Sequence, residues 1–184
     1  MENKKTAVFG IYTTVAAADL ATDSLVKAGF SASDVSALLP ENLGPKPIAT
    51  EKATKAPEGA AAGAGTGAVL GGALGLLAGV GMLAIPGLGP FIAAGPIMAG
   101  LAGLGVGGAV GGFTGALIGM GIPEYEAKRY EGRLKKGGIL LSVHCDTSDE
   151  IKRAKEILKN TGAEDISSTG ESSSGTSKTQ SAGV

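Results

Sequence analysis

The sequence predicts an α+β protein in which a ferredoxin-like domain is interrupted by an antiparallel hairpin of glycine-rich membrane helices. Three observations lead to this fold class. Strand-like segments alternate with segments of helical periodicity on both sides of the middle of the chain. The middle itself, residues 59–123, holds 65 consecutive positions without a charge. Within it glycine recurs at every fourth position, a spacing typical of closely packed helices.

Composition limits the classes of function. The 184 residues suffice for one modest domain with an insertion. The formal net charge of −1 provides no field that would attract nucleic acid or an acidic substrate. A single cysteine, Cys145, excludes an internal disulfide and a zinc cluster within one chain. The N-terminal apolar run is too short for a signal peptide, and Thr13 and Thr14 interrupt it.

The first half of the predicted domain covers residues 5–40. β-Branched and aromatic residues predict its strands, and apolar residues at helical spacing predict its helix. The expected elements are a strand at 6–12, a helix at 17–28 that Gly29 ends, and a strand at 35–39 that Pro40 ends. Residues 41–58 mix Pro, Lys, Thr and Glu without periodicity, so we expect a solvated linker there.

A helical hairpin is expected over residues 59–122. One membrane span needs about 20 apolar residues, so this segment has room for two. We place one helix near 62–85 and its antiparallel partner near 97–121. Proline and glycine between them stop a helix and permit a reversal. The residues assigned to this turn are Pro86, Gly87, Gly89 and Pro90.

The glycine repeat predicts helix packing and self-association. Glycine within a water-exposed helix costs about 1 kcal/mol relative to alanine, whereas small residues in lipid let two helices approach closely. A four-residue repeat drifts by roughly 40° per step around a helix, so the glycine stripe faces more than one neighbour. The assigned glycines are Gly59, Gly63, Gly67, Gly71, Gly75 and Gly79 in the first arm, and Gly103, Gly107, Gly111, Gly115 and Gly119 in the second.

The second half of the domain is expected over residues 123–168, followed by a disordered, serine-rich tail at 169–184. Its expected elements are a helix from Pro123 through Leu134, a strand at 139–143, a helix capped by Ser148 and stopped by Gly162, and an edge strand at 165–168. The two halves can share a sheet only on one side of a membrane, and two passes of the hairpin satisfy that requirement.

Several stretches carry a family resemblance. They are residues 7–12 (AVFGIY), the glycine-rich middle, residues 121–131 (GIPEYEAKRYE) and residues 137–143 (GGILLSV). Through them most of residues 5–168 resembles a bacterial family of general stress or heat-induced stress proteins, which are predicted membrane proteins of unknown function. The resemblance implies a stress-linked, membrane-associated role and supplies no catalytic residue.

The candidate sites carry little chemistry. His144 and Cys145 are adjacent on a strand and point to opposite faces, so we expect neither catalysis nor metal binding. Tyr125 and Tyr130 suit a membrane interface. The helix after the hairpin is basic, and its charges either form a solvated face with nearby Glu residues or bind anionic lipid headgroups. These charges are Lys128, Arg129, Arg133, Lys135 and Lys136.

These patterns predict a non-enzymatic membrane protein that needs no cofactor and assembles with itself in a lipid bilayer, with no nucleic-acid or small-molecule partner identified. The alternatives are a soluble oligomeric particle or filament, with hairpins packed against one another, and a membrane channel. A wide channel is disfavoured because Thr66 and Thr114 are the polar side chains of the middle. Lys52 and Lys55 precede the hairpin and the basic helix follows it, so both termini are expected to face the cytoplasm from the cytoplasmic membrane.

Overall fold

The computed structural model describes residues 6–43, 81–85, 87–105 and 112–170. It is an α+β fold around one six-stranded sheet, in which every pair of neighbouring strands is antiparallel and the order is β3-β4-β2-β5-β1-β6. The strands are β1 (Thr6–Tyr12), β2 (Val35–Pro40), β3 (Gly81–Ile85), β4 (Gly89–Ala94), β5 (Ile139–Cys145) and β6 (Glu164–Gly170).

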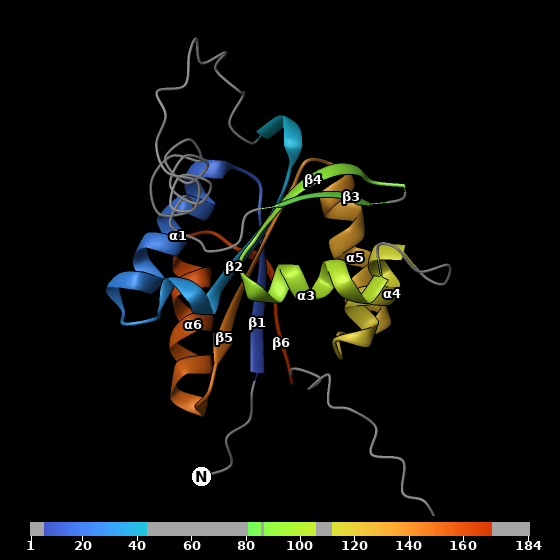
Figure 1. Cartoon of the computed structure of the whole chain (residues 1–184). Helices are drawn as coiled ribbons and strands as arrows, with labels where there is room; N and C mark the ends of the chain where they lie inside the picture. The colour runs from blue at the N-terminus through green and yellow to red at the C-terminus, as the bar shows by residue number, and fades with distance from the viewer. Residues whose placement is uncertain (1–5, 44–80, 86, 106–111, 171–184) are drawn as a thin grey trace, which may run out of the picture.

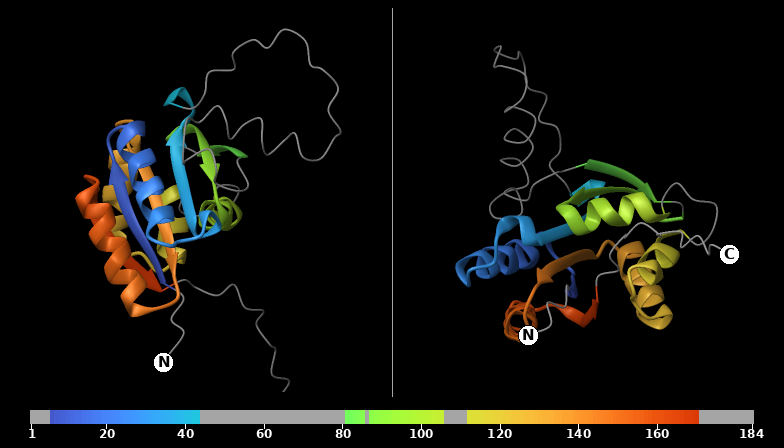
Figure 2. Two further views of the ribbon diagram at one scale, coloured as in Figure 1. Left: turned by 90° about the vertical axis from the view of Figure 1, so that its left-hand side faces the viewer. Right: turned by 60° about the horizontal axis from the view of Figure 1, so that its bottom comes forward.

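Helices cover both faces of the sheet (Figures 1 and 2). One face carries α1 (Val15–Lys27) and α6 (Ser148–Asn160), which pack against each other. The other face carries α3 (Pro96–Gly105), α4 (Gly112–Gly119) and α5 (Glu124–Lys135). Short 3₁₀ turns precede and follow β2, at Ala32–Asp34 and Glu41–Leu43.

The strand β1, which lies between β5 and the edge strand β6, is buried on both faces, as its uninterrupted apolar sequence indicates. It pairs with β5 from Thr6↔Cys145 to Tyr12↔Ile139, and on its other edge with β6. Because successive side chains of a strand alternate between faces, Val8 contributes to the core under α1 and α6, whereas Phe9 contributes to the core under α3, α4 and α5. The two halves of the sequence therefore meet in the middle of one sheet.

The second core takes much of its volume from the uncharged middle of the chain. Phe91 and Met98 are at most 2 % exposed and pack with residues of β1 and β5. Leu101, Phe113 and Leu117 from α3 and α4 lie in the same core. These apolar side chains are therefore part of the packing of the domain against its own sheet.

The expectation of a helix that continues to Ile85 is wrong. Residues 81–85 form β3, which pairs with β4 from Gly81↔Ala93 to Ile85↔Gly89. β4 in turn pairs with β2, for example at Leu39↔Ile92. The physical reason is that an apolar run without clear periodicity can form either a helix or a strand. Here the edge of β2 offers backbone hydrogen-bond partners to β4, and β4 offers them to residues 81–85, so both segments form strands. Residues 62–80 of the expected first helix lie outside the described residues.

The second expected helix, 97–121, corresponds to α3 and α4, with residues 106–111 between them outside the described ranges. α3 packs on β2 and β4, and α4 packs between α3 and α5. In the part of the chain that the structure describes, no helix combines the length and apolar character that crossing a membrane requires. The expected linker beyond Leu43 and the expected tail beyond Gly170 also lie outside the described residues.

The strands and helices expected on either side of the middle are confirmed, although several of their ends differ. β6 runs to Gly170, so the expectation of a disordered tail is wrong for residues 169 and 170, and Glu41–Leu43 form a 3₁₀ turn where the linker was expected to begin. The cap of the last helix also shifts. Helix α6 begins after Thr147 and not after Ser148. The Thr147 hydroxyl accepts a hydrogen bond from Glu150 N at 3.2 Å, and the Glu150 carboxylate accepts one from Thr147 N at 3.1 Å. This reciprocal capping box satisfies two backbone donors, which a cap at Ser148 would not do.

Candidate functional site

Helix α5, where the sequence predicts a basic surface, is amphipathic. Ala127, Tyr130 and Leu134 recur at intervals of three and four residues and are buried against the sheet. The Tyr130 ring lies 6.5 Å from the ring of Phe9 in β1, measured between centroids. Glu124 and Glu126 in the first turn and Arg133 and Lys135 in the last complement the helix dipole.

Four of the five predicted headgroup residues form ion pairs within the domain. Lys128 and Lys135 pair with glutamates one turn earlier in α5, at 2.6 Å each. Arg129 and Arg133 pair with carboxylates of β6 at 2.8 Å each. Lys136, at the end of the helix, has no ion-pair partner among the described residues. Nearby carboxylates thus balance most of this basic surface, and lipid binding by it stays a prediction.

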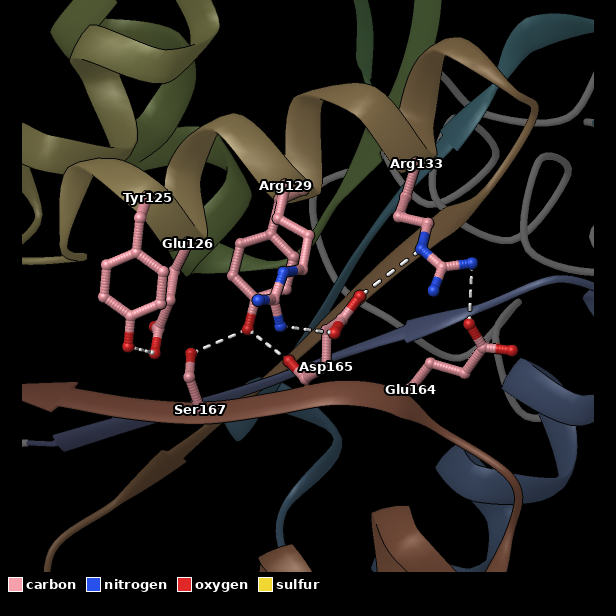
Figure 3. A network of polar contacts seen from close by, with 8 residues as sticks. Tyr125, Glu126, Arg129, Arg133, Glu164, Asp165 and Ser167 are labelled. Atoms are coloured by element: carbon pink, nitrogen blue, oxygen red, sulfur yellow. Dashed lines mark hydrogen bonds and ion pairs between the residues drawn. The ribbon is translucent and has the colours of Figure 1, made fainter.

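A seam of polar contacts joins α5 to the edge strand β6 (Figure 3). The Tyr130 hydroxyl lies 2.6 Å from the carbonyl oxygen of Asp165, to which it donates, and 2.7 Å from the Ser167 hydroxyl. Burial of the Tyr130 phenol raises its pKa to about 12, although the hydrogen bond with Ser167 partly opposes the shift. The ring is therefore neutral at ordinary pH and ties the helix to the last strand.

Asp165 is the centre of this seam, and sequence reasoning did not identify it as a site residue. Its backbone has φ of +51°, at a point where the pairing of β6 with β1 shifts register. Its Oδ1 accepts a hydrogen bond from Arg129 at 2.8 Å, and its Oδ2 lies 3.3 Å from Arg133 Nε without hydrogen-bond geometry. Asp tolerates the left-handed region better than most residues, and Asp within an otherwise strand-like segment is the sequence signal for such a bulge.

A second polar link joins α4 to α5. The Thr114 hydroxyl donates to the carboxylate of Glu131, which also pairs with Lys135. The hydrogen bond from Lys135, followed by that from Thr114, lowers the pKa of Glu131. The sequence predicts that Thr114 is one of two polar groups inside a membrane hairpin. In the structure Thr114 contacts Glu131, a charged residue of the neighbouring helix.

The expected turn residues lie at a real reversal of the chain, which connects two strands instead of two helices. Gly87 and Gly89 have positive φ, and Leu88 N donates to Ile85 O at 3.0 Å. Pro90 follows as the second residue of β4, and Pro86 lies outside the described residues. The reversal is therefore a β-hairpin loop.

The structure describes only a few of the predicted packing glycines. Gly103 lies in α3, and Gly115 and Gly119 lie in α4, which packs against α3. The remaining assigned glycines lie outside the described residues, and their role in helix packing stays a prediction. They are Gly59, Gly63, Gly67, Gly71, Gly75, Gly79, Gly107 and Gly111.

His144 and Cys145 end β5 on opposite faces, as their adjacency predicts. Cys145 is fully buried under α1 and α6. His144 Nε2 lies 3.2 Å from Asp146 Oδ1, and both line a polar hollow of about 60 Å³ with Arg153. Across the described ranges, no three His, Cys, Asp or Glu side chains are grouped so that they could hold a metal ion.

A larger, open groove of about 710 Å³ lies beside the β3–β4 turn and the end of α5. Phe91 and Leu134 provide apolar lining, and Glu41 and Lys136 provide charges of both signs. The mixed lining selects no single ligand chemistry.

Comparisons with protein families, with curated proteins and with solved structures found no match to this chain. The resemblance to stress proteins accordingly stays an expectation.

Proposed function

We propose that the protein is non-enzymatic and assembles with itself through its glycine-rich segment, residues 59–80. The observation that carries this proposal is the place of the segment in the fold. It directly precedes β3, the outermost strand on one side of the sheet. The core residues that the structure describes come from the strands of the sheet and from the helices on its two faces.

The composition of this segment supports contact with another copy. It carries no charge, and Gly59, Gly63, Gly67, Gly71, Gly75 and Gly79 recur at every fourth position. Such a repeat is unfavourable in a solvated helix and favourable where two backbones pack closely. A glycine surface complementary to itself needs no partner of a different sequence, which favours a homo-oligomer.

We also propose that the protein contains a ferredoxin-like unit, into which the remaining elements are inserted. The support is the order β2-β5-β1-β6, with α1 and α6 as the crossovers β1-α1-β2 and β5-α6-β6 on one face. In this proposal the insertion consists of β3, β4, α3, α4 and α5, which extend the sheet and cover its other face. We include a stress-related role in the proposal, and its support is the resemblance of the sequence to the stress-protein family.

Association with a bilayer is the second candidate. Residues 59–80 are about as long as one membrane span, and Lys52 and Lys55 precede them. The fold restricts the manner of binding, because β2 and β3 belong to one sheet. A single crossing between them would separate these strands, so the segment would have to enter and leave the bilayer on the same side.

Sedimentation velocity of the full chain over a wide concentration range tests self-assembly. We expect oligomers in the wild type and a shift toward monomer in the double variant Gly67→Ile/Gly71→Ile, because branched side chains prevent close approach. Ala73→Ile is the matched control, since position 73 lies away from the glycine stripe. A wild type that is monomeric at every concentration contradicts the proposal.

Flotation with phosphatidylglycerol-containing vesicles and with vesicles of phosphatidylcholine alone tests the second candidate. Binding to both kinds of vesicle that the glycine double variant retains supports insertion of the segment, because isoleucine favours the bilayer interior. Binding only to the anionic vesicles that survives in this variant supports headgroup contacts by the basic helix. Protein that assembles yet stays in the lipid-free fraction excludes both forms of the lipid proposal.

A further inference from the structure

We propose that the open edge of β3 pairs antiparallel with β3 of a second copy, which joins two six-stranded sheets into one. This inference rests on the proposed self-assembly and names the surface that sets its geometry. The sheet has two edges, β3 and β6, and each has a partner on one side only within the described residues. The two edges differ in how they are protected against pairing.

The β6 edge has two features that discourage strand pairing. Glu164 and Asp165 place charges at its start, and both are held by arginines of α5. The left-handed backbone of Asp165 and the register shift beside it break the regular ladder. Charges and bulges are the usual means by which proteins prevent edge-to-edge association.

The β3 edge has none of these protections. Its five residues, GMLAI, include no charge and no proline, and Gly81 and Ala84 are small and exposed. A hypothetical Cβ at Gly81, which would point from the face of the sheet, would meet no described atom within 4 Å. An uncharged edge strand is a template for pairing with another strand.

Proline fixes which backbone groups of β3 face outward. Ala84 pairs with Pro90 of β4. Because Pro90 has no N–H, this pair cannot exchange both backbone hydrogen bonds and is a non-hydrogen-bonded pair. The N–H and C=O of Ala84 therefore point away from β4, toward the open edge, and those of Met82 do the same by the two-residue period.

A second copy suits this edge because a strand that pairs with itself must not bring like charges together. Two β3 strands related by a two-fold axis near Leu83 let Ala84 exchange both backbone hydrogen bonds with Met82 of the partner subunit. Neither strand contributes a charge to this contact. A strand that carried one ionised side chain would place it close to its own copy.

The variant Ala84→Pro tests this inference in the full chain. It removes an N–H that makes no bond to β4, and proline is tolerated on an edge strand at such a position. In sedimentation velocity we expect at least a tenfold weaker association than in the wild type. Ala84→Val, which keeps the N–H and favours a strand, should associate like the wild type.

A second variant guards against a folding defect in Ala84→Pro. Ala84→Lys keeps the N–H but sets two charges close together across the two-fold axis, so its association should weaken at low salt and recover in 1 M NaCl. If the wild type assembles and neither Ala84→Pro nor Ala84→Lys weakens that assembly, pairing through β3 is wrong, whereas the proposed self-assembly stands. A monomeric wild type overturns both.

Hydrogen exchange separates a second copy from another segment of the same chain as the occupant of the edge. With a second copy, protection of the Ala84 amide rises with protein concentration. The alternative is that another segment of the same chain covers the β3 edge. In that case protection of the Ala84 amide is the same at every protein concentration, and Ala84→Pro lowers the urea midpoint of the monomer. That result overturns the inference.

Discussion

Ser36 of β2 and Ser142 of β5 lie directly opposite each other in the sheet, and both are fully buried, yet only Ser36 has a hydrogen-bond partner in the described part of the chain. The Ser36 hydroxyl accepts a hydrogen bond from Ile97 N at 3.0 Å, at the start of α3. The Ser142 hydroxyl has no hydrogen-bond partner among the described residues. Ser36 thus anchors α3 to the sheet, whereas Ser142 adds an unmatched polar group to the core.

The two serines should respond in opposite ways to alanine. Ser36→Ala leaves the buried Ile97 N–H without an acceptor and should lower the free energy of unfolding by about 1–3 kcal/mol. Ser142→Ala removes an unpartnered hydroxyl and should be neutral or stabilising by up to about 1 kcal/mol. Urea unfolding followed by circular dichroism measures both. A loss from Ser142→Ala as large as that from Ser36→Ala would mean that Ser142 has a partner in solution.

Gly95 should tolerate substitution far less than Gly137, although both have φ near +90°. A Cβ at Gly95 would lie 2.4 Å from Ser36 Oγ and 2.5 Å from Val35 O, whereas one at Gly137 would meet nothing within 4 Å. Gly137→Ala should cost only the conformational strain, about 1–2 kcal/mol. Gly95→Ala adds overlap with backbone atoms, so we expect a loss of about 3 kcal/mol or more in urea unfolding. Equal losses would contradict the tight contact between this turn and β2.

Two of the three tyrosines should ionise late. Burial raises the pKa of Tyr12 and of Tyr130 to about 12, opposed in part by hydrogen bonds with Thr161 and Ser167 respectively. Because the folded pKa lies above the unfolded value of about 10, the stability they contribute is complete below pH 10 and is lost as the pH rises toward 12. Absorbance at 295 nm should therefore show that Tyr12 and Tyr130 ionise together with alkaline unfolding.

Two single variants identify the late steps. Tyr12→Phe and Tyr130→Phe should each remove one late-titrating group, and Tyr125→Phe, on the exposed side of α5, should leave both late steps in place. Complete ionisation of all three tyrosines near pH 10 in the folded protein would contradict the burial of the two hydroxyls.

Asp165 offers a test that separates charge from backbone conformation. Asp165→Asn keeps a residue that tolerates positive φ and removes the charge facing Arg129 and Arg133, so the urea midpoint should fall slightly, and less in 1 M NaCl. Asp165→Val adds a β-branched residue at φ of +51°, which should cost a further 1–3 kcal/mol or so at any salt concentration. Identical midpoints for the two variants would show that the bulge is not maintained in solution.

The sequence by itself determined the elements on either side of the uncharged middle. Alternation between strand-like and helical segments, with glycine or proline at their ends, was enough for β1, α1, β2, α5, β5 and α6. It also located the reversal at Gly87 and Gly89, because proline and glycine restrict the backbone locally. The positions of the basic residues of α5 followed from its helical period, but their partners did not. Glu164 and Asp165 lie some thirty residues further along the chain, and only the packing of β6 beside α5 brings them to Arg129 and Arg133.

Only the tertiary structure decided what the apolar residues from Gly81 to Gly119 become. An uncharged run of glycine, alanine and aliphatic residues has no polar face, so its period cannot distinguish a membrane helix, a buried helix or a strand buried in a sheet. The free edge of β2 supplied backbone partners, which made residues 89–94 a strand and residues 81–85 the next one. The open face of the same sheet then supplied an apolar surface for α3 and α4. Local sequence sets what each segment can become, whereas hydrogen-bond partners and buried area from distant residues select among these states.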